Sequence, residues 1–334
     1  MDVNVVSSAC ACVVSESSTV ARRGTSSCRW LEDKQRTLKE SDMTKPVVGF
    51  IGLGLMGGNM VECLQKNGFE PIVMDLNKEA VATVVARGAT EATSAAELAA
   101  ASDFVMLALT TSAVVEKIVY GNDGILAGIK EGAVLIDFGT SIPASTRKIG
   151  ADLEMKGAGM VDAPLGRTPA HAKDGLLNIM AAGDKATFDK AKPMLDVLGE
   201  NIFYLGALGA GHTTKLINNF MGMTTVCAMS QAFAVADQAG VDRQQLFDIM
   251  STGPSSSPFM QFCKNYAVDG VSDLGFSIAN ANKDLGYFVE MVEDLGTRSE
   301  IAEGTSSNLK AAVAAGMGNG NVPEILDYFL KLEK

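Results

Sequence analysis

The sequence has little histidine and no regular cysteine pattern. His171 and His212 are the only histidines in 334 residues. The six cysteines include Cys10-Ala-Cys12, but no histidine lies nearby, and none of the last three cysteines has C-x-x-C spacing. We therefore expect no zinc site or other metal centre. The cysteines are expected to be free thiols, which is typical of a reducing compartment such as the cytoplasm.

Long apolar runs and excess positive charge are also missing. No apolar run reaches the roughly 18 residues that span a bilayer. The chain has 28 Lys and Arg against 39 Asp and Glu, which gives a formal net charge of −11. This balance lacks the basic footprint of nucleic-acid binding and of a polybasic membrane patch. An anionic substrate would have to be attracted by local charges inside a cleft.

The first 42 residues differ in composition from the rest of the chain. They are rich in Ser, Thr and Cys and show no sustained apolar periodicity. We expect residues 1–42 to be a disordered extension, with Met43 as the natural start. The remaining length is enough for two domains of ordinary size.

Residues 43–208 contain short apolar runs that alternate with helical patterns. This alternation predicts right-handed βαβ units around a parallel sheet. A capping box, Ser94-x-x-Glu97, opens one of the helices. The expected strands cover residues 47–51, 71–74, 104–109, 133–138, 160–163, 176–181 and 202–205.

Helical patterns take over after Gly211. Residues 213–239 are predicted to form one long helix that joins the two halves, and helices near 309–329 are broken between Gly316 and Gly320. The predicted fold class is therefore α/β, with an N-terminal domain around a parallel sheet over residues 43–208 and a C-terminal all-α domain over residues 209–334.

A glycine-rich turn follows the first expected strand. Gly52, Gly54 and Gly57 form G-x-G-x-x-G between a strand and a helix, which is the context of a dinucleotide-binding fingerprint rather than of an ordinary turn. The first glycine permits the tight turn, the second admits a pyrophosphate, and the third allows close packing of the helix. The start of the helix would then offer N–H groups to the phosphates.

Asp75 ends the second expected strand, about 20 residues further on. An acid at this place accepts hydrogen bonds from the ribose hydroxyls and repels a 2′-phosphate. It favours NAD(H), although nearby Lys78 leaves NADP(H) possible. The alternative role for Asp75 is an N-cap of the next helix.

Three polar residues lie on one face of the long predicted helix. Lys215, Asn218 and Asn219 stand at i, i+3 and i+4 in an apolar setting. A lysine can act as an acid or base if burial or a nearby cation lowers its pKa, and Lys283 could be that cation. The alternatives are a solvated lysine at a helix start and a surface ion pair between Lys283 and Asp284.

Five motifs in this order resemble the β-hydroxyacid dehydrogenase family, which includes 3-hydroxyisobutyrate dehydrogenase and tartronate semialdehyde reductase. They are GFIGLGLMG, DFGTSIP, DAPLGRT, GAGHTTKLINN and NKDLG, and the resemblance extends from about residue 45 to 329. It implies an N-terminal Rossmann NAD-binding domain over residues 43–208 and an NAD(P)-dependent oxidoreductase acting on CH–OH groups. It also implies a homodimer or homotetramer built through the all-α domain.

The resemblance also implies roles for individual residues. Lys215 would be the general acid that protonates the carbonyl oxygen during reduction, and Asn218 and Asn219 would contribute to substrate binding. The substrate loop would be formed by Gly166, Arg167 and Thr168. The residues expected to bind the cofactor are Gly52, Leu53, Gly54, Met56, Gly57, Asp75, Leu109, Thr110, Thr140 and Lys283.

The substrate loop departs from the common family pattern. Typical members have Val-Ser-Gly-Gly where this chain has Leu165-Gly166-Arg167-Thr168. The Gly-Arg-Thr sequence is similar to that of sulfolactaldehyde reductases, in which an arginine would suit a sulfonate. Gly222 stands where such a reductase would have a serine. We expect Arg167 to bind the anion, with His171 as a further partner; the alternative is a brace to Asp162 or Asp174.

The expected function is an NADH-dependent reductase of a short anionic aldehyde acid. The first choice of substrate is 3-sulfolactaldehyde. The alternatives are succinic or tartronate semialdehyde, a 3-hydroxyisobutyrate-type acid, or a non-catalytic scaffold that binds the cofactor.

Overall fold

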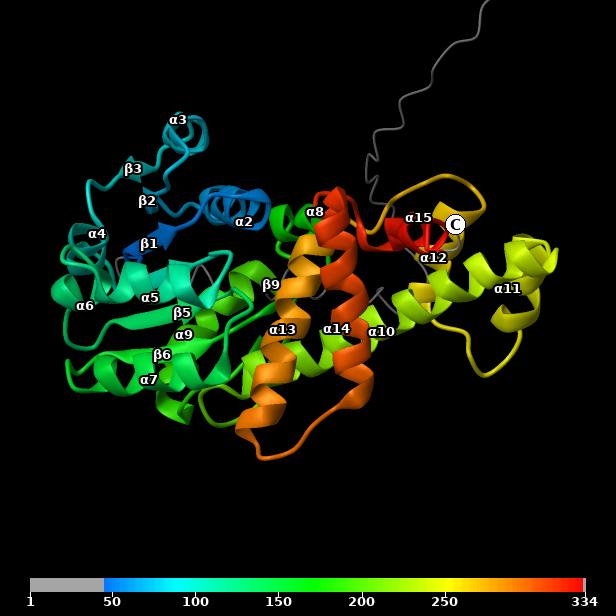
Figure 1. Cartoon of the computed structure of the whole chain (residues 1–334). Helices are drawn as coiled ribbons and strands as arrows, with labels where there is room; N and C mark the ends of the chain where they lie inside the picture. Colours follow the sequence, from blue (N-terminus) through cyan, green and yellow to red (C-terminus); the bar gives the residue numbers. More distant parts are fainter. Residues whose placement is uncertain (1–44, 333–334) are drawn as a thin grey trace, which may run out of the picture. The chain divides into compact units, whose positions relative to one another are not determined.

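A computed structural model describes residues 45–332, and the extension predicted for residues 1–42 lies outside this range. Six parallel strands form the main sheet in the order β3-β2-β1-β4-β5-β6 (Figure 1). This is the strand order of a doubly wound dinucleotide-binding sheet. Successive strands are added on one side of β1 up to β3 and on its other side from β4 onward, so the strand order reverses between β1 and β4. The strands are β1 (Val48–Ile51), β2 (Ile72–Met74), β3 (Thr90–Glu91), β4 (Phe104–Leu107), β5 (Val134–Asp137) and β6 (Gly159–Asp162).

A second sheet follows the first and corrects one expectation. The apolar run at 176–181 was expected to extend the parallel series, but β8 (Leu177–Ala181) belongs to a separate sheet of order β7-β8-β9. Its partners are β7 (Leu165–Gly166), which is antiparallel to it, and β9 (Gly199–Tyr204), which is parallel. The two-residue strand β7 is too short to leave a periodic signal.

Helices cover both faces of the main sheet, and α4 begins at the cap that the sequence predicts. Ser94 accepts a hydrogen bond from the Glu97 N–H at 3.1 Å, as in a capping box. The return bond differs, because the Glu97 carboxylate accepts from the Thr93 N–H, at 2.8 Å, and not from that of Ser94. The helices are α2 (Leu55–Lys66), α3 (Lys78–Val85), α4 (Ala95–Ala101), α5 (Ser112–Tyr120), α6 (Ile125–Gly128), α7 (Pro143–Glu154), α8 (Pro169–Lys173) and α9 (Lys185–Leu198).

The C-terminal half is helical, as predicted. It begins with α10 (Ala210–Ala239), whose 30 residues include the predicted 213–239 segment. Gly316, with a φ of 86°, interrupts the chain where the sequence predicted a break. The other elements are α11 (Arg243–Ser251), α12 (Pro258–Ala267), α13 (Ile278–Asp294), α14 (Glu300–Ala312), η1 (Val313–Met317), η2 (Val322–Glu324) and α15 (Ile325–Phe329).

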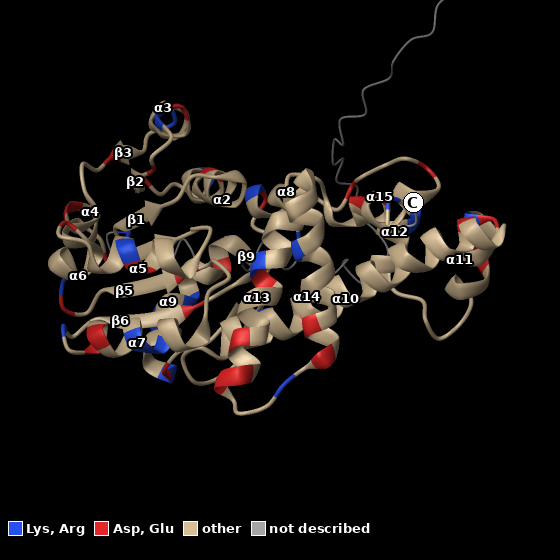
Figure 2. Cartoon of the chain, viewed as in Figure 1, with Lys and Arg blue, Asp and Glu red and all other residues tan. Residues whose placement is uncertain are grey.

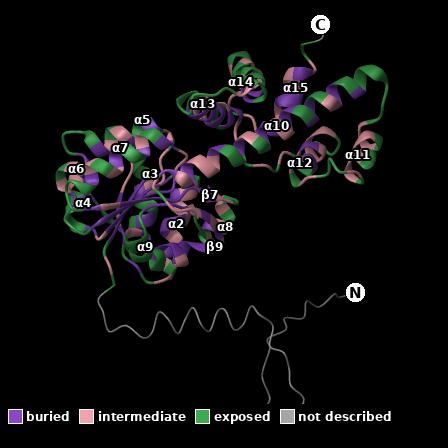
Figure 3. Ribbon diagram, turned by 90° about the horizontal axis from the view of Figure 1, so that it is seen from below, coloured by how far each residue is buried: buried purple, intermediate pink, exposed green. Residues whose placement is uncertain are grey.

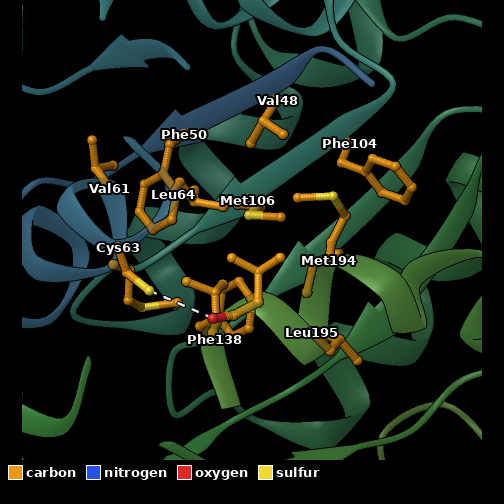
Figure 4. Packing of buried hydrophobic residues seen from close by; sticks show 14 of the residues in the cluster. Val48, Phe50, Val61, Cys63, Leu64, Phe104, Met106, Phe138, Met194 and Leu195 are labelled. Carbon is orange, nitrogen blue, oxygen red and sulfur yellow. Dashed lines mark hydrogen bonds between the residues drawn. The ribbon is translucent and has the colours of Figure 1, made fainter. Parts of the chain in front are cut away.

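The buried side chains form separate cores in the two halves. Figure 3 shows the strands of the main sheet buried between partly exposed helices. On one face of that sheet, Phe50 of β1 and Met106 of β4 pack with Leu64 of α2 and Met194 of α9 (Figure 4). In the helical half, Phe233 of α10 lies in a core shared with α12, α13, α14 and α15. Each half thus encloses its own apolar core.

A buried carboxylate connects the two halves. Asp162 ends β6 and is fully buried. Its two oxygens accept hydrogen bonds from the N–H groups of Gly209 and His212, each at 2.7 Å. Gly209 is the N-cap of α10 and has a φ of 90°, a conformation that favours glycine. Asp162 therefore anchors the first turn of α10 at the carboxyl end of β6.

The described cysteines Cys227 and Cys263 are free thiols, as the sequence predicted. Basic and acidic residues are mixed on helices such as α7 (Figure 2). Burial raises the pKa of the thiols of Cys227 and Cys263 to about 12 each, which makes them poor nucleophiles. Within residues 45–332, no helix has the length and hydropathy of a membrane span, and no group of three His, Cys, Asp or Glu is arranged to hold a metal.

Candidate functional site

The three glycines after β1 have three different physical roles. Gly52 has a φ of 98°. A Cβ atom on Gly57 would lie 1.9 Å from the carbonyl oxygen of Gly52, so α2 can approach the turn only without a side chain there. A Cβ atom on Gly54 would have no heavy atom of the described chain within 4 Å. Gly54 therefore faces open space at the start of α2, as a phosphate cradle requires.

The end of β2 also suits a dinucleotide. Asp75 accepts hydrogen bonds from the N–H groups of Leu53, at 2.5 Å, and Asn77, at 2.7 Å. Asn77, and not Asp75, is the N-cap of α3, because its side chain accepts from two N–H groups of the first turn. Asp75 therefore connects β2 to the glycine-rich turn through Leu53, which is where a ribose-binding acid is needed.

A pocket of about 540 Å³ opens beside Asp75. It lies between the segments that follow β2 and β3, and Lys78 and Glu91 stand on its wall. The Lys78 Nζ and a Glu91 carboxylate oxygen are 2.6 Å apart, so the positive charge of Lys78 is balanced inside the pocket. The residues that line the pocket are Met74, Asp75, Leu76, Lys78, Glu91, Ala92 and Thr93.

Lys283 joins the helical half to the loops that follow β4 and β5. Its Nζ donates to the carbonyl oxygen of Thr110 at 2.8 Å and to that of Thr140 at 3.5 Å. It also lies 3.0 Å from Asp284. The sequence left this ion pair as an alternative, but at the surface, whereas Asp284 is buried. Leu109 packs against the turn at Gly52, since its Cδ2 would be 3.1 Å from a Cβ there. Five predicted cofactor residues, Gly52, Leu109, Thr110, Thr140 and Lys283, therefore meet at the carboxyl ends of β1, β4 and β5.

Lys215 contacts the residue that directly precedes the predicted substrate loop. Its Nζ donates to the carbonyl oxygen of Leu165, on β7, at 2.7 Å. Burial lowers the pKa of Lys215 and the charge of Lys283 lowers it further, while the Asp284 carboxylate opposes both. A lysine in this setting can lose or regain a proton closer to neutral pH than a solvated lysine can.

The two asparagines after Lys215 have different surroundings. Asn218 is exposed, one turn beyond Lys215. Asn219 is buried, and its amide donates to the Asp284 carboxylate at 2.7 Å. Asn219 therefore faces α13 and holds the carboxylate that sits beside Lys283. We predicted Asn219 as a substrate ligand, but in this structure its amide is used within the protein.

Arg167 does not point its charge into open space. Its guanidinium donates to the carbonyl oxygen of Leu176 at 2.7 Å and forms an ion pair with Glu200 of β9. Nη1 of Arg167 thus braces the loop, and its acidic partner is neither Asp162 nor Asp174. The contact of Arg167 with an anion stays a prediction. Glu200 lies 33 residues away on a strand that pairs with β8, and no local pattern relates the two.

The backbone of the substrate loop is unusual at Arg167. Among the described residues other than glycine, it is the only one with a positive φ, at 77°. This conformation is costly for a side chain with a Cβ atom and is more often found at functional positions. Beside it, the Thr168 hydroxyl is 2.7 Å from Nδ1 of His171, so these two side chains are paired with each other.

An aromatic ring covers α10 beyond Asn218. A Cβ atom on Gly222 would lie 2.6 Å from Cζ of Phe259, which is the second residue of α12. Gly222 is seven residues after Lys215, which places it on nearly the same helical face about 10 Å further along. The Phe259 ring therefore covers the face of α10 that carries Lys215, about two helical turns beyond the lysine.

The comparisons with known proteins agree with this geometry. A family model of the NAD-binding domain of 6-phosphogluconate dehydrogenase matches residues 47–206. A second model, the NAD-binding domain of NADP-dependent 3-hydroxyisobutyrate dehydrogenase, matches residues 209–329. The 3-sulfolactaldehyde reductase of Escherichia coli strain K12 is 31% identical over 281 residues, which are 84% of this chain and 94% of that one. The chain belongs to the β-hydroxyacid dehydrogenase family.

Two further relatives also match most of the chain. The NAD-dependent L-serine dehydrogenase of Pseudomonas aeruginosa is 33% identical over 264 residues, 78% of this chain and 87% of that one. The solved 3-hydroxyisobutyrate dehydrogenase of Mycobacterium tuberculosis with L-serine has a TM-score of 0.76 and 26% identity, and the match covers 87% and 100% of the two chains. The predictions of fold, family and enzyme class are confirmed: the chain is an NAD(P)-dependent oxidoreductase that acts on CH–OH groups.

Several residues at the site escaped the sequence analysis. The hydroxyl of Tyr287, on α13, accepts from the Ser112 N–H at 3.1 Å, and the Ser112 hydroxyl accepts from the Ile142 N–H at 2.7 Å. These bonds join α13 to α5 and to the start of α7. A tyrosine four residues after Lys283 on the same helical face was the available signal.

The different surroundings of Gly54 and Gly57 lead to a matched prediction. Gly54→Ala places a methyl group in the phosphate cradle, and we expect NADH binding to weaken at least about tenfold while urea unfolding stays unchanged. Gly57→Ala forces α2 away from Gly52, and we expect a loss of about 1–3 kcal/mol in the free energy of unfolding. Fluorescence titration with NADH and urea denaturation check the pair. Equal effects of both substitutions on stability would contradict the cradle.

Proposed function

We propose that this β-hydroxyacid dehydrogenase reduces a short anionic aldehyde acid with NADH, and oxidises the corresponding hydroxy acid in reverse. The observation that carries the proposal is the pair of lysine contacts. Lys215 is bonded to the β7 loop, and Lys283 is bonded to the loops after β4 and β5. An acid–base group and a second cation thus lie at the carboxyl ends of the strands, where ligands bind in this fold.

The residues of the chain would divide the work as follows. When bound, the nicotinamide supplies the hydride to the aldehyde carbon. Lys215 would give its ammonium proton to the carbonyl oxygen, which prevents negative charge from accumulating there. Asn218, exposed one turn away, would hold the substrate, and the backbone of Gly166, Arg167 and Thr168 would contact the anionic group.

Residues around the glycine-rich turn would hold the dinucleotide. Gly52, Gly54 and Gly57 would take the phosphates with Leu53 and Met56, while Leu109, Thr110, Thr140 and Lys283 would lie near the nicotinamide. NAD(H) is favoured over NADP(H) because Asp75 would repel a 2′-phosphate. The Lys78–Glu91 ion pair strengthens that preference, since it balances the cation that could have attracted the phosphate.

The identity of the anion is the finer part of the proposal. The Gly-Arg-Thr loop and the similarity to a sulfolactaldehyde reductase make 3-sulfolactaldehyde the first compound to test. Two observations favour a carboxylate semialdehyde, such as succinic or tartronate semialdehyde, as the second. The Arg167 charge is balanced by Glu200, and Phe259 covers Gly222 where a sulfonate-binding hydroxyl would be expected.

The chain is expected to work as a homodimer or homotetramer in the cytoplasm. Ile217, Met221 and Val235 are exposed on one side of α10, which is unusual for a helix face that meets only water. Sedimentation equilibrium of the full chain measures the oligomeric state, and a monomer at micromolar concentration would contradict this expectation.

A substrate panel tests the function. Steady-state kinetics with NADH and NADPH should give turnover on at least one short aldehyde acid, with a higher kcat/KM for NADH. The ratio of kcat/KM for 3-sulfolactaldehyde and for the carboxylate semialdehydes assigns the anion. Tight NADH binding without turnover on any of these compounds would favour a non-catalytic scaffold instead.

Removing Lys215, the proposed general acid, should affect turnover and not cofactor binding. Lys215→Ala should lower kcat by about 10²- to 10⁴-fold while the Kd for NADH changes less than about twofold. In the wild type, the reduction rate should fall as pH rises through the Lys215 pKa, because the acid must be protonated, and the oxidation rate should rise. Since burial lowers this pKa, the midpoint should lie below the usual value of about 10.4. An active Lys215→Ala variant would refute this mechanism.

The Phe259 ring should limit the length of the substrate. Phe259→Leu shortens the side chain that covers Gly222 and should raise kcat/KM for an acid longer by one methylene, relative to the shorter acid, by roughly tenfold. Phe247→Leu, which alters a partly buried ring of α11 in the same helical core, is the matched control and should leave that ratio unchanged. An unchanged ratio in Phe259→Leu would show that the ring does not bound the site.

A further inference from the structure

A histidine lies buried between two carboxylates where β5, β6 and α10 meet. Asp137 and Asp162 are the last residues of β5 and β6 and stand opposite each other in the register of the sheet. His212 is fully buried in the first turn of α10. Its Nε2 lies 3.8 Å from an Asp137 carboxylate oxygen, and its Nδ1 lies 3.8 Å from an Asp162 carboxylate oxygen.

The two ring nitrogens of His212 have different surroundings. Nδ1 lies 2.8 Å from the Thr146 hydroxyl, which is also 3.2 Å from the carbonyl oxygen of Ile142. Nε2 has no hydrogen-bond partner in the described part of the chain, and the Asp137 carboxylate lies 3.8 Å from it. An N–H group at Nε2 would be attracted to that carboxylate.

Each carboxylate organises a different part of the site. Asp137 accepts from the Gly139 N–H at 2.8 Å and the Ser141 hydroxyl at 2.9 Å, and so shapes the loop that contains Thr140. Asp162 accepts from two N–H groups at the start of α10, one turn before Lys215. His212, in the first turn of the helix that carries the proposed acid, thus faces the end of the strand whose following loop Lys283 touches.

We propose that His212 is a positioning residue that fixes Lys215 relative to the loop at 138–141 by attracting Asp137 across the junction. This role rests on the proposed function, because it concerns the placement of the proposed acid. A merely structural histidine would need only its Nδ1 contact with Thr146. The contact between Nε2 and Asp137 therefore distinguishes the two roles.

Two substitutions separate the two ring nitrogens. Asparagine places its terminal atoms as far from Cα as Nδ1, whereas glutamine reaches as far as Nε2. His212→Gln should therefore keep a donor near Asp137, and His212→Asn should not. We expect kcat to fall about 10²-fold in His212→Asn, since small misplacements of reacting groups have effects of this size. In His212→Gln it should fall less than about tenfold, with the Kd for NADH within about twofold of wild type in both.

The controls keep the outcome interpretable. Ser230→Ala removes another buried polar group from α10 and should leave kcat unchanged. Equal kcat values for the Asn and Gln variants would overturn the proposal. If His212→Asn does not fold, Asp137→Asn weakens the same attraction from the other side, and wild-type kcat in that variant would overturn it.

A second measurement does not depend on turnover. Amide hydrogen exchange should accelerate together in residues 138–141 and 209–215 of the Asn variant and stay near wild type in the Gln variant. Acceleration in only one of these segments would contradict the coupling. Absence of turnover in the wild type would count against the proposed function, while the exchange result would still decide whether His212 joins the two segments.

Discussion

The arrangement of this site depends on the hydrogen bonds that the buried Asp162 carboxylate accepts from the first turn of α10. A carboxylate at a helix N-terminus is favoured both by the free N–H groups and by the helix dipole. The 30 residues of α10 extend for about 45 Å and also form part of the helical core, so the orientation fixed at Asp162 is transmitted to that core. The hydrogen bonds of Asp162 with the first turn of α10 therefore also position Lys215, which lies in the second turn.

The chemistry of the site follows from cations placed inside an acidic chain. The net charge of −11 gives no long-range attraction for an anion. Lys215 and Lys283 supply positive charge locally, and Asp284, held by Asn219, lies beside Lys283. Burial and the charge of Lys283 lower the pKa of Lys215, while the Asp284 carboxylate balances part of the positive charge. Lys215 can therefore serve as a proton donor with a lowered pKa. The proposed acid–base role of Lys215 and the contact of Lys283 with the loops after β4 and β5 are therefore two properties of one charged cluster.

Local signals sufficed for much of the fold and for part of the site. The glycine-rich turn, the capping box and the long helix each carry their pattern within a few residues, so the sequence predicted them. The ion pair of Arg167 with Glu200 and the ring of Phe259 over Gly222 arise from residues more than 30 positions apart. Only the folded chain brings such residues together, which is why the sequence did not identify Glu200 as the partner of Arg167. The buried role of Asn219 was missed because helical spacing does not say which neighbour a face meets.

The most direct test of this account is the Asp162→Asn variant, which replaces one acceptor by an amide donor facing the N–H groups of α10. The account predicts that the free energy of unfolding decreases by about 1.5–3 kcal/mol, the range for hydrogen bonds to a charged group. It also predicts that kcat of the folded variant falls more than about tenfold with an unchanged Kd for NADH, because Lys215 is displaced. A variant that loses stability but keeps the wild-type kcat would contradict the claim that this contact positions the catalytic lysine.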